Sequence, residues 1–190
     1  HQGKSALIST GTGSGKTEAF LYPIISRCLE KRDHGAPEGI SAVIVYPMNA
    51  LAEDQMDRLR DLLAGTGISF GLYVGKTPES AIHGIQLQHS SSRADYRSKL
   101  EQCWKRGDDS QVYPAEERVT RQQLRKDPPR ILLTNVKQLE LLLTRQRDIQ
   151  MFDGADLDYL VFDEAHTFTG ANGAETAVLI RRLRSFCGEG

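Results

Sequence analysis

The chain has 190 residues, a formal net charge of -1 and 39% hydrophobic residues. This length is enough for one domain with a sizeable core, and the composition is ordinary for a soluble globular protein. The apolar runs are much shorter than the ~20 residues of a membrane span, and no secretory signal is visible. The near-zero charge excludes a global basic field, so local patches must hold any nucleic-acid partner.

Strand and helix patterns alternate along much of the chain, which predicts an α/β fold with a parallel sheet flanked by helices. The expected strands are the short apolar runs at residues 6–9, 41–46, 68–74, 130–134 and 159–162. The expected helices cover about residues 16–32, 50–64, 136–144 and 174–186. In the second helix, four apolar residues form one stripe that we interpret as core packing: Ala52, Met56, Leu59 and Leu63.

A polar segment at about 76–127 interrupts this alternation and is rich in Ser, Arg, Lys, Gln and Asp. We interpret it as an insertion between core elements, with helices predicted around residues 93–106 and 118–126. One hypothesis is that the insertion is solvated and partly mobile. The other is that it docks a partner or grips DNA through its basic residues, Arg93, Arg97, Lys105, Arg106, Arg121 and Arg125.

The segment Gly11–Thr17, Gly-Thr-Gly-Ser-Gly-Lys-Thr, lies between an expected strand and an expected helix. Its glycines permit backbone angles that let successive N–H groups wrap a phosphate at a helix N-terminus. In such a loop Lys16 reaches the β- and γ-phosphates, and the Thr17 hydroxyl binds Mg²⁺. The strand, loop and helix context favours this phosphate loop over a chance glycine-rich turn.

A second candidate element, Asp163-Glu164-Ala165-His166, follows the apolar run at 159–162. Ligands of open α/β sheets bind at the carboxyl ends of the strands, where these acids are expected. Asp163 can hold Mg²⁺ through a water, and Glu164 can orient and deprotonate the water that attacks the γ-phosphate. His166 is then expected near the γ-phosphate. A zinc site at His166 is disfavoured because no other ligands stand at metal spacing.

At these residues the sequence resembles the superfamily 2 DEAH-type helicases. Residues Thr10–Phe20 resemble their motif I, and Val161–Glu175 resembles motif II with an extension found in one subgroup. That subgroup contains the Lhr-like and MrfA-like repair helicases and the DISARM-type phage-defence helicases. The resemblance implies a P-loop NTPase, RecA-like fold that uses ATP and Mg²⁺. The ATP contacts that it implies are Thr12, Gly13, Ser14, Gly15, Lys16 and Thr17.

Three further segments resemble family elements that touch the nucleic-acid backbone. Tyr46–Ala52 resembles motif Ia, Gly75–Thr77 stands in the place of motif Ib, and Pro128–Asn135 resembles a Thr-Asn element on the strand path. The residues implied as nucleic-acid contacts are Pro47, Asn49, Gly75, Lys76, Thr134 and Asn135. Such polar groups position a strand without reading its bases. Without the resemblance, the residues alone favour a simpler interpretation, in which Pro47 and Asn49, and likewise Thr134 and Asn135, only end a strand and cap a helix.

The resemblance implies an ATP-dependent helicase or translocase that moves along DNA, single-stranded or tailed duplex, with low sequence specificity. Two alternatives remain: a motor subunit of a phage-defence or restriction complex that does not separate strands, and a nucleotide-gated scaffold. The presence of Lys16, Thr17, Asp163 and Glu164 disfavours the scaffold. Three widely spaced cysteines, Cys28, Cys103 and Cys187, are a poor disulfide framework and favour a cytoplasmic location.

The sequence contains one phosphate loop and no second lobe of the kind that supplies arginine fingers in this family. We therefore expect residues 1–190 to form a single, incomplete RecA-like ATP-binding lobe of a larger protein. An arginine finger contributes about 10³–10⁵ in rate in related phosphate chemistry. The isolated chain is accordingly expected to hydrolyse ATP negligibly, and strong DNA-stimulated turnover by it would contradict this expectation.

Overall fold

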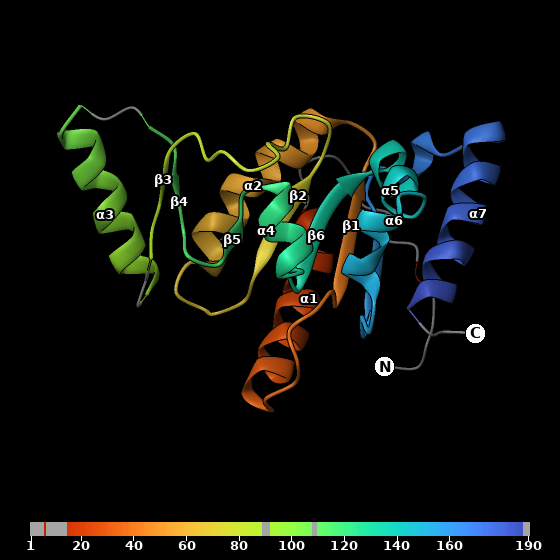
Figure 1. Cartoon of the computed structure of the whole chain (residues 1–190), viewed down its shortest axis with the longest axis horizontal. Coiled ribbons are helices and arrows are strands. Elements are labelled where there is room, and N and C mark those ends of the chain that lie inside the picture. The colour runs from red at the N-terminus through yellow and green to blue at the C-terminus, as the bar shows by residue number, and fades with distance from the viewer. Residues whose placement is uncertain (1–5, 7–14, 89–91, 108–109, 188–190) are drawn as a thin grey trace.

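Five parallel strands form the main sheet of the computed structural model, which describes residues 6, 15–88, 92–107 and 110–187 (Figure 1). Their order across the sheet is β5-β2-β6-β1-β7. The strands are β1 Ala42–Tyr46, β2 Phe70–Tyr73, β5 Glu117–Arg118, β6 Ile131–Asn135 and β7 Tyr159–Phe162. The parallel α/β fold predicted from the sequence is therefore confirmed.

The inner strands are buried because their sequences are continuous apolar runs. All five residues of β1 are buried, and Ala42 stands opposite both Ile131 of β6 and Tyr159 of β7. Strands covered on both faces read as apolar throughout rather than as alternating apolar and polar residues. The same register places the carboxyl ends of β1, β6 and β7 side by side.

Helices cover both faces of the sheet, because successive side chains of a strand point to opposite sides. On one face, Ile44 of β1 and Leu133 of β6 pack with α1 and α2. On the other face, Val43 and Leu132 pack with α4, α5, the turn η1 and α7. The bounds of these elements are α1 Lys16–Asp33, α2 Asn49–Leu63, α4 Arg121–Lys126, α5 Val136–Leu142, η1 Gln150–Phe152 and α7 Gly170–Phe186. Two short elements complete this part, α6 Gln146–Ile149 and η2 Ala165–Thr167.

The predicted apolar stripe of α2 is confirmed. Ala52, Met56, Leu59 and Leu63 are all buried and belong to the core cluster that also holds Ile44. Helix α2 therefore covers the face of the sheet on which Ile44 of β1 lies.

The segment at about 76–127 is only partly the peripheral insertion that the sequence suggested. At one end of the molecule, away from α7, it forms α3 Arg93–Lys105 with the short strands β3 Ile85–Gln86 and β4 Val112–Tyr113 (Figure 1). Its later part belongs to the main fold, since β5 pairs with β2 and Leu124 of α4 is fully buried. The polar composition concealed this strand because both residues of β5 are charged.

The two helices predicted within this segment are confirmed as α3 and α4. Several of its basic side chains pair with acids of the same chain. Arg93 and Arg97 both donate to Asp61 of α2, from their Nε atoms at 3.0 and 2.7 Å. Arg125 pairs with Glu79 and approaches the buried carboxylate of Asp148. These contacts dock α3 and α4 onto the fold rather than leaving a free basic patch.

The last helix starts earlier than predicted, at Gly170 instead of about residue 174. Thr169 is extended and Gly170 has a φ of 58°, so the turn into the helix lies in a glycine-containing segment of low helix propensity. Leu179 and Leu183 of this helix are buried, whereas Phe186 is 44% exposed.

The strand expected at residues 6–9 lies outside the described residues apart from Ala6. Among the helices that are described, none combines the length and the apolar character that crossing a membrane requires.

Candidate nucleotide and nucleic-acid site

The structure brings most of the predicted site residues to one edge of the sheet. Because the strands are parallel, their carboxyl ends meet along a single edge. Pro47 directly follows β1, Gly75 comes shortly after β2, Asn135 ends β6 and Asp163 follows β7. The candidate ATP and nucleic-acid elements are therefore neighbours although they are distributed over most of the chain.

Asp163 is held where β7 ends next to β1. Its backbone N–H donates to the Val45 carbonyl at 3.0 Å, which continues the pairing of the two strands by one residue. One carboxylate oxygen, Oδ1, accepts a hydrogen bond from the backbone N–H of Glu164 at 2.9 Å. The half-buried side chain is thus fixed by its own turn.

Glu164 has an unusual backbone conformation. It is the one non-glycine residue with positive φ among the described residues, at φ 50° and ψ 45°. The left-handed region costs free energy for such a residue, and residues held there cluster at functional sites. Thr167 maintains the turn, because its N–H and its hydroxyl both donate to the Glu164 carbonyl at 2.9 Å.

His166 lies close to the carboxylate of Glu164. Its Nδ1 is 3.2 Å from Glu164 Oε2, and the histidine side chain is 75% exposed. The two side chains therefore form a contact on the open side of the turn, and either can respond to a group that arrives there.

Helix α1 begins next to the predicted phosphate loop. Gly15 precedes it with a φ of 76°, and no side chain caps the helix start among the described residues. Thr17 is half-buried in the first turn. An uncapped helix N-terminus presents N–H groups and a favourable dipole to an anion. Thr12, Gly13 and Ser14 lie outside the described residues, as does the side chain of Lys16.

A buried tyrosine that the sequence did not single out lies beside this site. The Tyr46 hydroxyl, at the end of β1, is buried and has no hydrogen-bond partner among the described residues. Burial raises the pKa of Tyr46 above its usual range, and the charge of Asp163 raises it further while Arg58 opposes them. The tyrosine hydroxyl therefore stays neutral and remains available to a polar group. Its only sequence signal was a tyrosine at the end of an apolar strand.

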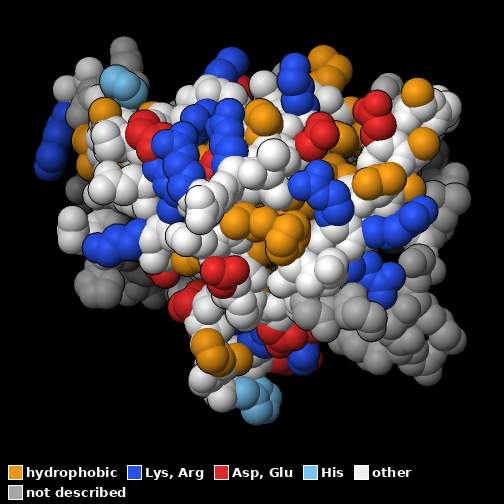
Figure 2. All heavy atoms as spheres, turned by 45° about the vertical axis from the view of Figure 1, so that its right-hand side comes forward, with side chains coloured by type: hydrophobic (Ala, Val, Ile, Leu, Met, Phe, Trp, Pro, Cys, Tyr) orange, Lys and Arg blue, Asp and Glu red, His pale blue; other side chains and the backbone are white. Residues whose placement is uncertain are grey.

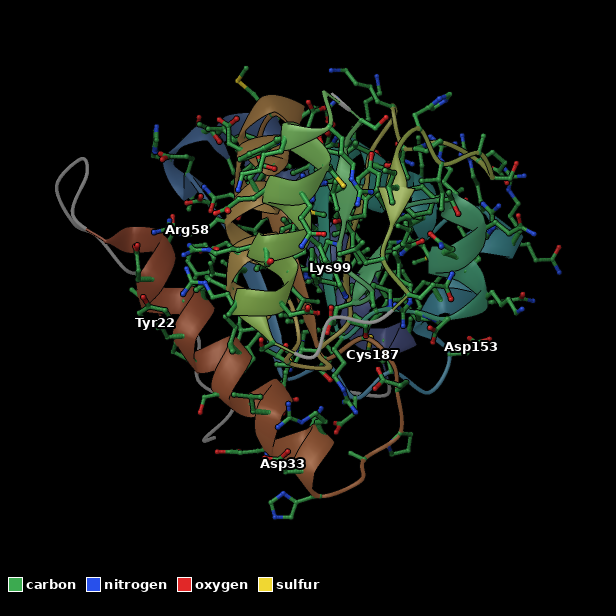
Figure 3. All side chains as sticks on the ribbon, turned by 90° about the vertical axis from the view of Figure 1, so that its left-hand side faces the viewer. Tyr22, Asp33, Arg58, Lys99, Asp153 and Cys187 are labelled. Carbon is green, nitrogen blue, oxygen red and sulfur yellow. The ribbon has the colours of Figure 1, made fainter. Side chains whose placement is uncertain are left out.

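Arg58 of α2 connects the two helices that cover this face. It forms an ion pair with Glu18 in the first turn of α1, and Figure 3 shows Arg58 beside the start of that helix. The pair is half-exposed, so it contributes little free energy by itself. Its effect is positional, since it orients the beginning of α1 relative to β1 and α2.

Two asparagines join the ends of β1 and β6. The Asn135 side-chain amide donates to Asn49 Oδ1 at 2.5 Å, and Asn135 Oδ1 accepts from the Gln138 N–H at 2.7 Å. Asn135 is therefore an N-cap of α5, as the simpler interpretation held. Asn49 caps no helix, because α2 has Met48 at its N-cap position without a side-chain hydrogen bond. Both side chains are half-buried and remain accessible at the edge.

Thr134 and Lys76 have contrasting surroundings. Thr134 is fully buried, and its hydroxyl donates to the Tyr73 carbonyl at 2.7 Å, so in this structure it supports the edge from within. Lys76 is 75% exposed on the turn after β2, with its Nζ 3.4 Å from Glu53 of α2. Lys76 is thus held only by an exposed ion pair, whereas Thr134 bonds within the core.

Positive charge on the visible face is divided rather than continuous. Figure 2 shows Lys and Arg side chains on this face with Asp and Glu side chains among them. This pattern agrees with the formal net charge of -1 and with the internal ion pairs of the insertion. The face in Figure 2 therefore presents individually placed basic groups and no continuous basic surface.

The sequence is similar to several curated proteins. It is 29% identical to the Druantia protein DruE of Escherichia coli (strain UMEA 4076-1), over 93% of this chain and 14% of that protein. It is 25% identical to the uncharacterized ATP-dependent helicase YprA of Bacillus subtilis (strain 168), over 98% of this chain and 19% of that protein. The ATP-dependent helicase Lhr-Core of Methanothermobacter thermautotrophicus is 23% identical over 100% of this chain and 19% of its own length. The chain thus spans less than a fifth of these relatives.

A solved crystal structure has a similar fold. The DUF1998 helicase MrfA bound to DNA and AMPPNP matches with a TM-score of 0.59 and 27% identity, over 94% of this chain and 19% of that one. The resemblance predicted from the motifs is confirmed by these relatives. The sequence model of the DEAD/DEAH box helicases matches residues 1–189, and this chain therefore belongs to the DEAD/DEAH box helicase family.

Proposed function

We propose that this chain is the ATP-binding lobe of an ATP-dependent DNA helicase or translocase, which couples ATP hydrolysis to movement along nucleic acid. Membership of the DEAD/DEAH box family and similarity to proteins named as ATP-dependent helicases support the proposal. DNA is proposed as the track because the similar MrfA structure was solved with DNA and AMPPNP.

The described residues fit a magnesium-bound nucleotide. Gly15 leads into the 18-residue helix α1, and Asp163 directly follows β7. Among the described residues, no side chain caps α1 and the buried Tyr46 hydroxyl has no hydrogen-bond partner. We propose that Thr12–Thr17 hold the phosphates, with Lys16 on the β- and γ-phosphates. Thr17 and Asp163 would hold Mg²⁺, which neutralises the charge that develops during phosphoryl transfer.

Glu164 is the proposed general base for hydrolysis. Its carboxylate would orient the attacking water and accept its proton. The strained turn at Glu164 would hold the side chain in the position that this step needs. His166, 3.2 Å from that carboxylate, would sense the loss of the γ-phosphate. Through this contact, hydrolysis of ATP would change the position of the residues that follow His166.

The proposed DNA contacts are the groups at the ends of β1, β2 and β6. Pro47, Asn49 and Asn135 lie at adjacent strand ends, and Gly75 and Lys76 form the exposed turn after β2. Thr134 belongs to this set as a predicted contact, although its hydroxyl bonds inside the fold. These groups suit a phosphate backbone and predict low sequence specificity.

One observation carries the proposal: Asp163 and Glu164 leave the sheet beside β1, at the edge that also presents Asn49, Asn135 and Lys76. The test uses the full-length protein, a fluorescent 3′- or 5′-tailed duplex and hydrolysable ATP. ATP-dependent strand separation that is lost on Lys16→Ala would support a helicase. ATP-dependent removal of streptavidin from biotinylated single-stranded DNA, without strand separation, would support a translocase. Neither activity, in a protein that binds ATP, would overturn the proposal.

A motor or nucleotide-gated scaffold subunit of a phage-defence or restriction complex, without strand separation, is the second candidate. The segment Val161–Glu175, which resembles motif II with its extension, motivates this candidate because helicases of such systems have a similar segment. A cytoplasmic location is part of the same proposal. The streptavidin assay distinguishes a moving motor from a scaffold that only binds nucleotide.

A further inference from the structure

The exposed turn after β2 is held in place by a helix of the polar insertion. Arg121, the first residue of α4, donates from Nη2 to the Val74 carbonyl at 3.1 Å and to the Gly75 carbonyl at 2.9 Å. Its guanidinium also stands over the Tyr73 ring, with Cζ 5.3 Å from the ring centre. One side chain therefore contacts three consecutive residues immediately before Lys76.

The backbone of α4 holds the far side of the same turn. The Arg121 N–H donates to the Pro78 carbonyl at 2.9 Å, and the Gln122 N–H donates to the Glu79 carbonyl at 3.0 Å. The start of α4 is itself rigid, because Thr120 and Gln123 form a reciprocal capping box. The turn is thus clamped on both sides of Lys76 by a helix whose Leu124 is buried in the core.

Inside the turn, Thr77 supplies the local support. Its hydroxyl donates to the Leu72 carbonyl at 2.8 Å and accepts from the Val74 N–H at 2.9 Å. These bonds shape the turn, but they do not fix it relative to the rest of the insertion. That second task falls to Arg121.

The clamped segment also connects to the other proposed DNA contacts. The Tyr73 carbonyl accepts from the Thr134 hydroxyl at 2.7 Å, and the next residue, Asn135, donates to Asn49. A chain of adjacent hydrogen bonds therefore runs from Arg121 through β2 and β6 to the start of α2. This arrangement holds the ends of β2 and β6 and the start of α2 in fixed positions relative to one another.

We propose that Arg121 is a positioning residue that holds the Gly75–Lys76 turn in the geometry needed to contact a DNA backbone. The inference rests on the proposed function, because it concerns how the proposed contact residues bind DNA. Arg121 itself need not touch DNA, since its Nη2 donates to Val74 and Gly75 and its Nε is buried. Lysine cannot replace it fully, because an ammonium lacks the planar guanidinium that stacks on the Tyr73 ring while its Nη2 donates to both carbonyls.

The test compares Arg121→Ala and Arg121→Lys in the full-length protein. We expect the DNA concentration for half-maximal ATP hydrolysis to rise about five- to tenfold in Arg121→Ala, the size expected for two lost hydrogen bonds. The maximal rate and the DNA-independent rate should stay within about twofold of wild type, because the ATP-site residues are untouched. Arg121→Lys should give a smaller rise.

Arg97→Ala is the matched control, because Arg97 belongs to the same insertion but pairs with Asp61 on α2. Amide hydrogen exchange supplies a readout that does not depend on DNA. Exchange at Val74 and Thr77 should accelerate in Arg121→Ala while β1 and β6 remain protected, and Arg97→Ala should leave the turn unchanged.

The outcomes separate this inference from the proposed function. A wild-type protein that DNA does not stimulate would overturn the proposed function, and hydrogen exchange would still decide whether Arg121 holds the turn. Unchanged exchange at Val74 and Thr77 would overturn the inference. So would a loosened turn with unchanged half-saturation by DNA, or a loss of protection throughout the sheet in both Arg121 variants.

Discussion

The two edges of the sheet use charged and polar side chains in opposite ways. At the amino edge, Lys31 is 5% exposed and satisfied within the chain, by ion pairs to Asp156 and Asp158 and by hydrogen bonds to Ser41 and the Asp156 carbonyl. At the carboxyl edge, the Tyr46 hydroxyl has no partner in the part of the chain that the structure describes, and Glu164 occupies a strained backbone region. The Lys31 cluster is satisfied within the chain, whereas the Tyr46 hydroxyl and the strained Glu164 turn have no such internal explanation among the described residues.

The difference shows where stability and function are expected to separate. A buried charge whose partner is removed destabilises a fold strongly, because the remaining charge is left unpaired. Polar groups that await a ligand contribute little to folding and sometimes oppose it. Substitutions at the amino edge should therefore lower stability first, whereas substitutions at the carboxyl edge should lower activity first.

The largest expected effect is at Glu164. In the full-length protein, Glu164→Gln should reduce ATP hydrolysis by about 10²–10⁴-fold, the usual contribution of a general base. ATP binding should persist, and the unfolding free energy should change by less than about 0.5 kcal/mol because the half-exposed side chain is not a core group. Glu140→Gln, an exposed change on α5, serves as the control in steady-state hydrolysis and equilibrium binding assays. Full hydrolytic activity in Glu164→Gln would refute the assigned role.

The amino edge should behave in the reverse way. Lys31→Met should lower the unfolding free energy by about 3 kcal/mol, because Asp158 would lose one of its two cationic partners and keep only Arg27. Urea unfolding of the chain measures this change, with Lys105→Met as a control on an exposed lysine of α3. A loss of unfolding free energy no larger than that of the control would show that the Lys31 ion pairs do not stabilise the fold.

A smaller effect is expected at Lys76. Lys76→Ala should weaken DNA binding by the full-length protein and reduce the slope of log affinity against log salt by about 1, because one phosphate contact is lost. Lys126→Ala, an exposed lysine at the end of α4, provides the comparison. Fluorescence anisotropy across a salt series gives both numbers. Equal slopes in wild type and Lys76→Ala would show that Lys76 does not contact a DNA phosphate.

The smallest effect concerns the docking of α3 on α2. Hydrogen bonding from Arg93, with a further contribution from Arg97, holds the pKa of Asp61 below its usual range. The contact therefore stabilises the fold above the ordinary aspartate pKa of about 4 and is lost as pH falls through the lower, folded-state value. Asp61→Asn should lower the urea midpoint slightly at pH 7 and should match wild type at strongly acidic pH. A constant difference between Asp61→Asn and wild type across this pH range would contradict the linkage.

Sequence predicted the parts of this molecule that depend on local patterns. The apolar run of β1, the stripe of α2 and the acids after β7 can each be read within a few residues, because strand burial and helix periodicity repeat over short distances. The site edge then follows from the rule that parallel strands end together.

Contacts between distant segments could not be read in the same way. β5 consists of Glu117 and Arg118, which look like part of a solvated loop until β2 is seen beside them. Tyr46 looked like an ordinary strand end, and its relation to Asp163 depends on the pairing of β1 with β7. Arg121 resembled any arginine of a polar segment, because its partners lie about 46 residues earlier in the chain.

The central claim is that the carboxyl edge works as an ATP site driven by DNA. The most direct measurement is steady-state ATP hydrolysis by the full-length protein without nucleic acid and with single-stranded DNA, duplex DNA or RNA, beside Lys16→Ala. The account predicts strong stimulation by DNA, weaker stimulation by RNA and no activity in Lys16→Ala. Hydrolysis that none of these nucleic acids stimulates, or that survives in Lys16→Ala, would contradict it.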